Sequence, residues 1–128
     1  MSNLFIGLGA LNAFIAVAMG AFAAHALKEN LSERYLSVIQ TAVDYQFYHA
    51  LGLILIGLLY QLNKNKLTAQ AGWVMFCGII LFSGSLYVLG LSGTKWLGMV
   101  TPIGGFCFLI DWLMLAYAQL RPLADKNS

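Results

Sequence analysis

The chain has 128 residues, of which 60% are hydrophobic and only 9% are charged, whereas about a quarter of the residues of a typical soluble domain are charged. This composition excludes an ordinary soluble globular domain. The formal net charge of +2, without a run of basic residues, gives no indication of nucleic-acid binding.

The apolar residues fall into blocks of about 20, the length at which a helix rising ~1.5 Å per residue crosses ~30 Å of hydrocarbon. We expect membrane spans at Leu4–Ala24, about Ala42–Leu62, Ala69–Ser92 and Trp96–Leu120. The connections leave no room for a separate soluble domain. The sequence therefore predicts an all-α fold: an integral membrane four-helix bundle in the lipid bilayer, with residues 1–128 as a single membrane domain.

The first span also has one feature of a secretory signal, because AAHA at 23–26 offers an A-x-A-like arrangement of small residues. Its N-terminal flank has no Lys or Arg, and its apolar run exceeds the ~7 to 15 residues of a signal core. We expect it to be retained as the first helix.

The longest connection runs from Ala26 to about Gln40. Asn30, followed three positions later by Glu33, resembles a capping box at a helix start. Apolar residues follow at Leu31, Tyr35, Leu36, Val38 and Ile39. The pattern predicts an amphipathic helical connection, which either lies at the membrane interface or extends directly into the second span.

Short polar turns, NKNKLT at 63–68 and SGTK at 92–95, separate the later spans, and RPLADKNS at 121–128 forms a polar tail. The basic residues on the side of the termini are Lys64, Lys66, Arg121 and Lys126, and those on the other side are Lys28, Arg34 and Lys95. By the positive-inside rule this small excess predicts that both termini are cytoplasmic.

Antiparallel threading places several polar motifs in one half of the membrane, which we call the outer half because it adjoins the 26–40 connection. Polar groups in hydrocarbon are costly unless paired, so these side chains are expected to face one another inside the bundle. We call them the polar cluster: His25, Thr41, Asp44, Tyr45, Gln46, His49, Ser83, Ser85, Tyr87 and Thr101.

Within the polar cluster, Thr41, Tyr45 and His49 recur every four residues and form one stripe of a helix. Pro102 has no N–H to donate to the carbonyl of Gly98, so a bend is expected near the start of the fourth span. Two interpretations of the cluster remain open. It provides interhelical hydrogen bonds worth about 0.6 kcal/mol each, or it is a proton, ion or small-ligand site.

Asn12, Cys77 and Asp111 are each expected about eight or nine residues from the inner ends of their spans, and therefore at similar depth. Asn12 is the expected partner of Asp111, and an unpaired carboxyl at that depth is expected to stay largely protonated. If the pair forms, Asp111→Asn should be mild and Asp111→Leu destabilising.

No catalytic residue, metal site or cofactor is predicted. Cys77 and Cys107 lie inside spans and give no disulfide framework. His25, His49 and Asp44 lack a recognised ligand spacing, and neither a nucleophile elbow nor a Gly-rich phosphate loop is present.

Small residues at Ala16, Gly20 and Ala24 form a small-xxx-small row on the first span. The row either allows close packing within one bundle or mediates self-association. Four short helices bury only a limited surface among themselves, so we expect the protein to form a homo-oligomer or to bind a partner in a membrane complex.

Four segments in order, GAFAAHAL (20–27), TAVDYQFYHALGLI (41–54), LFSGSLYVL (81–89) and TPIGG (101–105), resemble the YgdD/YwdK family of small bacterial inner-membrane proteins. The resemblance covers nearly the whole chain. It implies four membrane spans in the bacterial inner membrane and carries over no catalytic residue, because this is a domain-of-unknown-function family. The chain departs from the family pattern at Ala23, where a glycine is usual, and at Asp111, where a small residue is common.

We therefore expect a small integral membrane protein without an assigned reaction, more consistent with a self-associating or accessory bundle than with an enzyme. The alternative is a small transporter or channel that uses the polar cluster as a proton, ion or small-ligand site. An intramembrane enzyme is the third hypothesis.

Overall fold

The structure is a computed structural model that describes residues 1–126, with side chains described as far as Arg121. Within the described residues the regular structure is entirely helical. Four helical stretches are long and apolar enough to cross a membrane: Ser2–Leu27, Glu33–Leu62, Lys66–Ser92 and Lys95–Arg121. The expected all-α membrane architecture is confirmed. The last two residues of the expected polar tail lie outside the described part of the chain.

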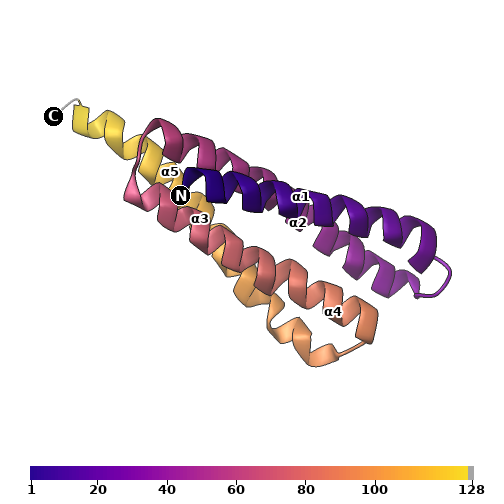
Figure 1. The fold of residues 1–128 in the computed structure, drawn as a ribbon. Helices are drawn as coiled ribbons and strands as arrows, with labels where there is room; N and C mark the ends of the chain where they lie inside the picture. Colours follow the sequence, from indigo (N-terminus) through magenta and orange to yellow (C-terminus); the bar gives the residue numbers. More distant parts are fainter. Residues whose placement is uncertain (127–128) are drawn as a thin grey trace.

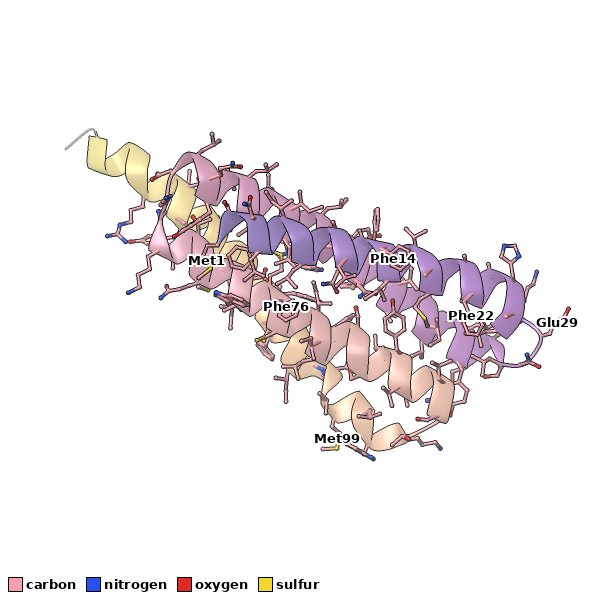
Figure 2. All side chains as sticks on the ribbon, viewed as in Figure 1. Met1, Phe14, Phe22, Glu29, Phe76 and Met99 are labelled. Atoms are coloured by element: carbon pink, nitrogen blue, oxygen red, sulfur yellow. The ribbon has the colours of Figure 1, made fainter. Side chains whose placement is uncertain are left out.

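Two antiparallel hairpins build the bundle (Figure 1). The first span is α1 (Ser2–Phe22) followed by a π-helical turn, η1 (Ala23–Leu27), and the second is α2 (Glu33–Leu62). The third span is α3 (Lys66–Ile79), a second π-helical turn η2 (Ile80–Gly84), and α4 (Ser85–Ser92). The fourth span is a 3₁₀ turn η3 (Lys95–Met99) and α5 (Thr101–Lys126). Both termini lie at the same end (Figure 1), and Met1 is far from Glu29 at the opposite end (Figure 2), which we call the outer end.

The connection between the first two spans becomes part of α2. Its N-cap is Ser32, whose Oγ accepts a hydrogen bond from the backbone N–H of Tyr35 at 3.3 Å. Asn30 instead donates from Nδ2 to the carbonyl of Ala26 at 3.1 Å, so the predicted Asn30–Glu33 capping box is wrong. Glu33 occupies the first turn, where a negative charge favours the helix dipole. The sequence left open whether the amphipathic segment lies at the membrane interface or extends into the second span. In the structure it extends directly into the second span as the first part of α2.

Glycines allow α1 and α2 to pack closely. A Cβ built on Gly9 would lie 2.6 Å from the carbonyl oxygen of Ala50, and one on Gly57 would lie 2.8 Å from that of Ser2. Ala16 is buried in the same contact. Because side chains larger than hydrogen would push the backbones apart, these positions set the spacing of the first hairpin.

The fourth span is divided near Pro102. Gly93, with φ +72°, ends α4 in the left-handed conformation, and α5 begins at Thr101 after the 3₁₀ turn. Pro102 thus falls in the first turn of α5, where its missing N–H needs no helical partner. The bend expected from the sequence is replaced by this break between η3 and α5. Two residues later Gly104 lies directly against the backbone of Phe82 in η2.

Helix α2 lies at the centre of the packing and contacts α1, α3 and α4, while α5 packs mainly on α3. The larger core cluster gathers apolar residues towards the inner half, among them Phe5, Leu53, Ile56, Met75 and Phe108. A smaller cluster at the outer end holds Ala23, Leu27, Ile39 and Val43. The polar side chains of interest lie between these two clusters.

Candidate functional site

A chain of hydrogen bonds connects three of the spans at mid-bundle. The Tyr87 hydroxyl on α4 donates to Gln46 Oε1 on α2 at 2.6 Å. Gln46 Nε2 in turn donates to Asn12 Oδ1 on α1 at 2.9 Å. Asn12 Nδ2 donates to the carbonyl of Leu8 at 2.8 Å, which completes the chain. Gln46 and Asn12 are buried, so their polar groups are satisfied by protein and not by water.

His49 has both ring nitrogens engaged. Trp112 Nε1–H donates to His49 Nε2 at 3.0 Å, which makes Nε2 an acceptor. His49 Nδ1 lies 2.7 Å from the carbonyl oxygen of Tyr45, which can only accept, so Nδ1 carries the proton. The ring also stacks on Phe108, with centroids 3.5 Å apart and an interplanar angle of 9°. These contacts fix His49 as a neutral imidazole in the Nδ1–H tautomer.

Serines near η2 tie the third span to its neighbours. The buried Ser83 hydroxyl donates to the carbonyl of Ala42 on α2 at 2.8 Å. Ser85 Oγ lies 2.6 Å from Thr101 Oγ1 at the start of α5 and also donates to the carbonyl of Phe82 at 2.9 Å. The π-helical turn thus coincides with interhelical hydrogen bonds, and π-bulges within α-helices are frequent at functional sites.

The other members of the polar cluster lie at its edge or outside it. Thr41 donates to the carbonyl of Ser37 in its own helix. Tyr45 is 40% exposed and makes ring contacts, the closest with Phe82 at 4.7 Å between centroids. Asp44 Oδ1 accepts from Gln40 Nε2 at 2.8 Å. The expected stripe of Thr41, Tyr45 and His49 therefore brings only His49 fully into the bundle, and Gln46 has the central place.

His25 does not join the polar cluster. It lies in η1 at the outer end, where its side chain is exposed. The π-helical turn places the buried Ala23 and Leu27 against the bundle, and His25, between them, faces away. The expectation that His25 meets the other polar groups is therefore corrected.

The expected contact between Asn12 and Asp111 is absent. Asn12 bonds to Gln46 and Leu8, and Asp111 is fully buried with neither carboxyl oxygen hydrogen-bonded within the described residues. Equal depth in the membrane was the basis of the prediction, but α1 packs mainly on α2 and α5 on α3, so the two side chains belong to different interfaces.

The sequence did not indicate Trp112 and Phe108, which hold the His49 ring. The only signal was their spacing of four on the fourth span, which places both on one face. Within residues 1–126 no three His, Cys, Asp or Glu side chains come together where a metal ion is held. Cys77 and Cys107 are free thiols.

At its centre, the polar cluster is a set of mutually satisfied hydrogen bonds between helices. Reaction chemistry needs a nucleophile, acid or base with a free position towards a substrate. At the centre of the polar cluster, Gln46 and His49 have their groups committed to protein partners. The geometry fits the hypothesis of interhelical hydrogen bonding.

Comparison with known proteins gives the family. Residues 19–105 match the family described as "Protein of unknown function (DUF423)". A UPF0382 membrane protein of Staphylococcus epidermidis (strain ATCC 12228) is 50% identical over 119 residues, which cover 93% of this chain and 97% of the relative. UPF0382 membrane protein YwdK of Bacillus subtilis is 46% identical over 122 residues, 94% of this chain and 99% of the relative.

A further relative, UPF0382 membrane protein SAB0533 of Staphylococcus aureus, is 51% identical over 119 residues, 93% of this chain and 97% of its own. No solved structure matches. The resemblance inferred from the sequence motifs is confirmed, and no biochemical activity is assigned to the family. The chain belongs to the DUF423 family of multi-pass membrane proteins.

Proposed function

We propose that this protein is a non-enzymatic membrane bundle that associates with a second copy of itself in the bacterial inner membrane. The observation that carries the proposal is the closed set of hydrogen bonds at mid-bundle, in which Gln46 is donor and acceptor to two other helices. Groups engaged in this way stabilise the arrangement of the helices and leave no free catalytic position. The function then depends on the lipid-facing surface of the bundle.

The surface that best supports association is the outward face of α5. Large apolar side chains recur along it at alternating intervals of three and four, and all of them are exposed: Ile103, Phe106, Ile110, Leu113, Tyr117 and Leu120. We call this set the α5 stripe. Such spacing brings one face of a helix along a neighbour in the left-handed crossings of about +20° that are common in membrane bundles.

A second copy is the partner that matches this stripe. Two copies inserted with the same orientation are related by a two-fold axis along the membrane normal, so each residue meets its own counterpart at the same depth. A self-complementary row of bulky apolar side chains fits that symmetry. Only 22% of the most apolar window in this span is buried within the monomer, the same share as in the first span, so the face is available.

Disulfide cross-linking in membrane vesicles tests the association. In a chain with Cys77 and Cys107 replaced by Ala, Leu113→Cys on the α5 stripe should give a cross-linked dimer under mild oxidation. The matched control is Phe14→Cys, because Phe14 is 70% exposed, close to the 72% of Leu113, but lies on α1. Dimer formation by the Phe14 variant and not by the Leu113 variant would contradict the proposed interface.

We also propose that both termini face the cytoplasm. The termini lie at one end of the bundle (Figure 1), together with the 63–65 turn that carries Lys64. The basic residues at that end are Lys64, Lys66, Arg121 and Lys126, against Lys28, Arg34 and Lys95 at the other. An excess of Lys and Arg in short loops favours the cytoplasmic side. A reporter that is active only after export, fused after Ser128, should be inactive, and activity would reverse the topology.

A further inference from the structure

We propose that a groove on the membrane-facing side of the α1–α2 hairpin binds a hydrophobic organic cation, with Asp44 as the counter-charge. The groove lies on a different face from the α5 stripe. The proposal therefore does not depend on self-association, and either can fail without the other.

The groove has a volume of about 400 Å³ and lies between the outer halves of α1 and α2. Small and apolar residues of α1 line one wall, and α2 supplies the other wall with one carboxylate and two aromatic rings. The lining residues are Ala16, Val17, Gly20, Ala21, Val43, Asp44, Phe47 and Tyr48. The groove is open because α1 has small side chains here. Gly20 lies so close to α2 that a Cβ added to it would be 3.3 Å from Val43 Cγ1, and a larger side chain would begin to fill the groove.

Asp44 is the only charged residue of the lining. Gln40 Nε2 donates to its Oδ1 at 2.8 Å, and the described side chains supply no hydrogen bond to Oδ2. The side chain is partly exposed towards the groove. A carboxylate within a membrane span is costly unless it is paired with a cation, so the charge of the groove favours a positively charged occupant.

The rest of the lining indicates which kind of cation fits. Apart from Asp44, the residues that line the groove carry no charge. A strongly hydrated amine loses its water at high cost in such a groove, whereas a cation surrounded by apolar groups enters it at lower cost. The apolar lining therefore matches the substituents of such a cation.

Aromatic rings beside the carboxylate add to this fit. Tyr48 is 57% exposed and Phe47 is 36% exposed, and both line the groove. The face of an aromatic ring attracts a cation, especially a weakly hydrated quaternary one. A carboxylate with neighbouring aromatic faces in an apolar groove is therefore complementary to an organic cation in both charge and shape.

A second copy of the chain fits this groove less well. Copies with the same orientation present residues of equal depth to each other. The basic residues of the outer half are Lys28, Arg34 and Lys95, and these lie near the outer ends of their helices or in the turns. A neighbouring copy would therefore cover Asp44 without neutralising it.

The test uses tetraphenylphosphonium as the cation and the full chain in phosphatidylcholine nanodiscs. Equilibrium dialysis should show saturable binding of one cation per chain. Tetraphenylborate, which has the same shape and the opposite charge, should not bind at this site. Equal saturable binding of the two ions, or no saturable binding of the cation, would overturn the proposal.

Variants then assign the site. Asp44→Asn should weaken binding of the cation at least about tenfold, and Tyr48→Leu about twofold to fivefold. Ala21→Phe should abolish binding by filling the groove while Asp44 remains. The control is Asp111→Asn, which removes a second membrane carboxyl far from the groove and should leave binding unchanged; far-UV circular dichroism and detergent unfolding check that each variant is folded. Unchanged binding by Asp44→Asn, or an equal loss in Asp111→Asn, would exclude Asp44 as the counter-charge.

Discussion

Replacement of Gly9 by Ala tests whether α1 and α2 pack as closely as they do in the structure. The added Cβ would lie 2.6 Å from the carbonyl oxygen of Ala50, 2.7 Å from Ile54 Cγ1 and 2.9 Å from Ile54 N. Ordinary non-bonded contacts between heavy atoms lie at ~3.5–4.0 Å, so the helices would have to separate locally by about 1 Å. Overpacking of this kind costs about 1–3 kcal/mol.

Gly7→Ala is the matched control, because Gly7 is in the same helix and a Cβ there meets nothing within 4 Å. Both variants gain the helix propensity of alanine over glycine, about 0.8–1.0 kcal/mol. That gain cancels when they are compared. Gly9→Ala should therefore be about 1–3 kcal/mol less stable than Gly7→Ala.

The measurement is unfolding in mixed micelles with increasing sodium dodecyl sulfate, followed by circular dichroism, with the free energy of unfolding obtained for each variant. The difference between the two variants is the quantity of interest. Equal free energies of unfolding for Gly9→Ala and Gly7→Ala would refute the close packing of α1 on α2.

The remaining predictions use the same assay. Asp111→Leu keeps the branching at Cγ and removes two buried oxygens without partners. It should therefore leave the free energy of unfolding unchanged or raise it by up to about 1–3 kcal/mol. Asp111→Asn should leave the free energy of unfolding close to that of the original protein. Trp112→Phe removes the donor to His49 Nε2 and should destabilise by about 0.6–1.7 kcal/mol, whereas Trp96→Phe, at an exposed position, should have little effect.

Each of these has a clear contrary result. Strong destabilisation by Asp111→Leu together with tolerance of Asp111→Asn would indicate that Asp111 has a polar partner, as the sequence first suggested. Equal stability of the Trp112 and Trp96 variants would indicate that the bond to His49 contributes nothing.

The all-α fold and the number of membrane-spanning helices were accessible from hydropathy, because the apolar runs and the polar turns alternate clearly. The residue at which α2 begins was harder to predict. Asn30 and Ser32 are both good N-cap residues, and the sequence alone does not decide which of them ends the connection.

The inward face of each span was harder to predict. A soluble helix has a polar face that indicates its orientation, but a membrane helix is apolar on the lipid side as well as in the core. The polar residues of span two lie next to one another in sequence, so Gln46 and Tyr45 point about 100° apart. Only the packing of α4 and α1 selects Gln46 for the centre.

Equal depth in the membrane does not make two residues neighbours. Asn12 and Asp111 were expected at comparable depth, but α1 packs mainly on α2 and α5 mainly on α3, so the two residues belong to different interfaces. His25 lies in a π-helical turn, for which the sequence has no recognised signature. These features depend on tertiary packing and could not be read from one sequence.

A double-mutant cycle between Tyr87 and Gln46 tests the central claim most directly, namely that the polar groups of the cluster stabilise one another across the helices. Free energies of unfolding are measured for Tyr87→Phe, Gln46→Leu and the double variant, and the cycle cancels the separate loss of the Asn12 bond. The structure, with the Tyr87 hydroxyl 2.6 Å from Gln46 Oε1, predicts a coupling of about 0.6–1.7 kcal/mol. A coupling of zero, with the two single effects strictly additive, would contradict it.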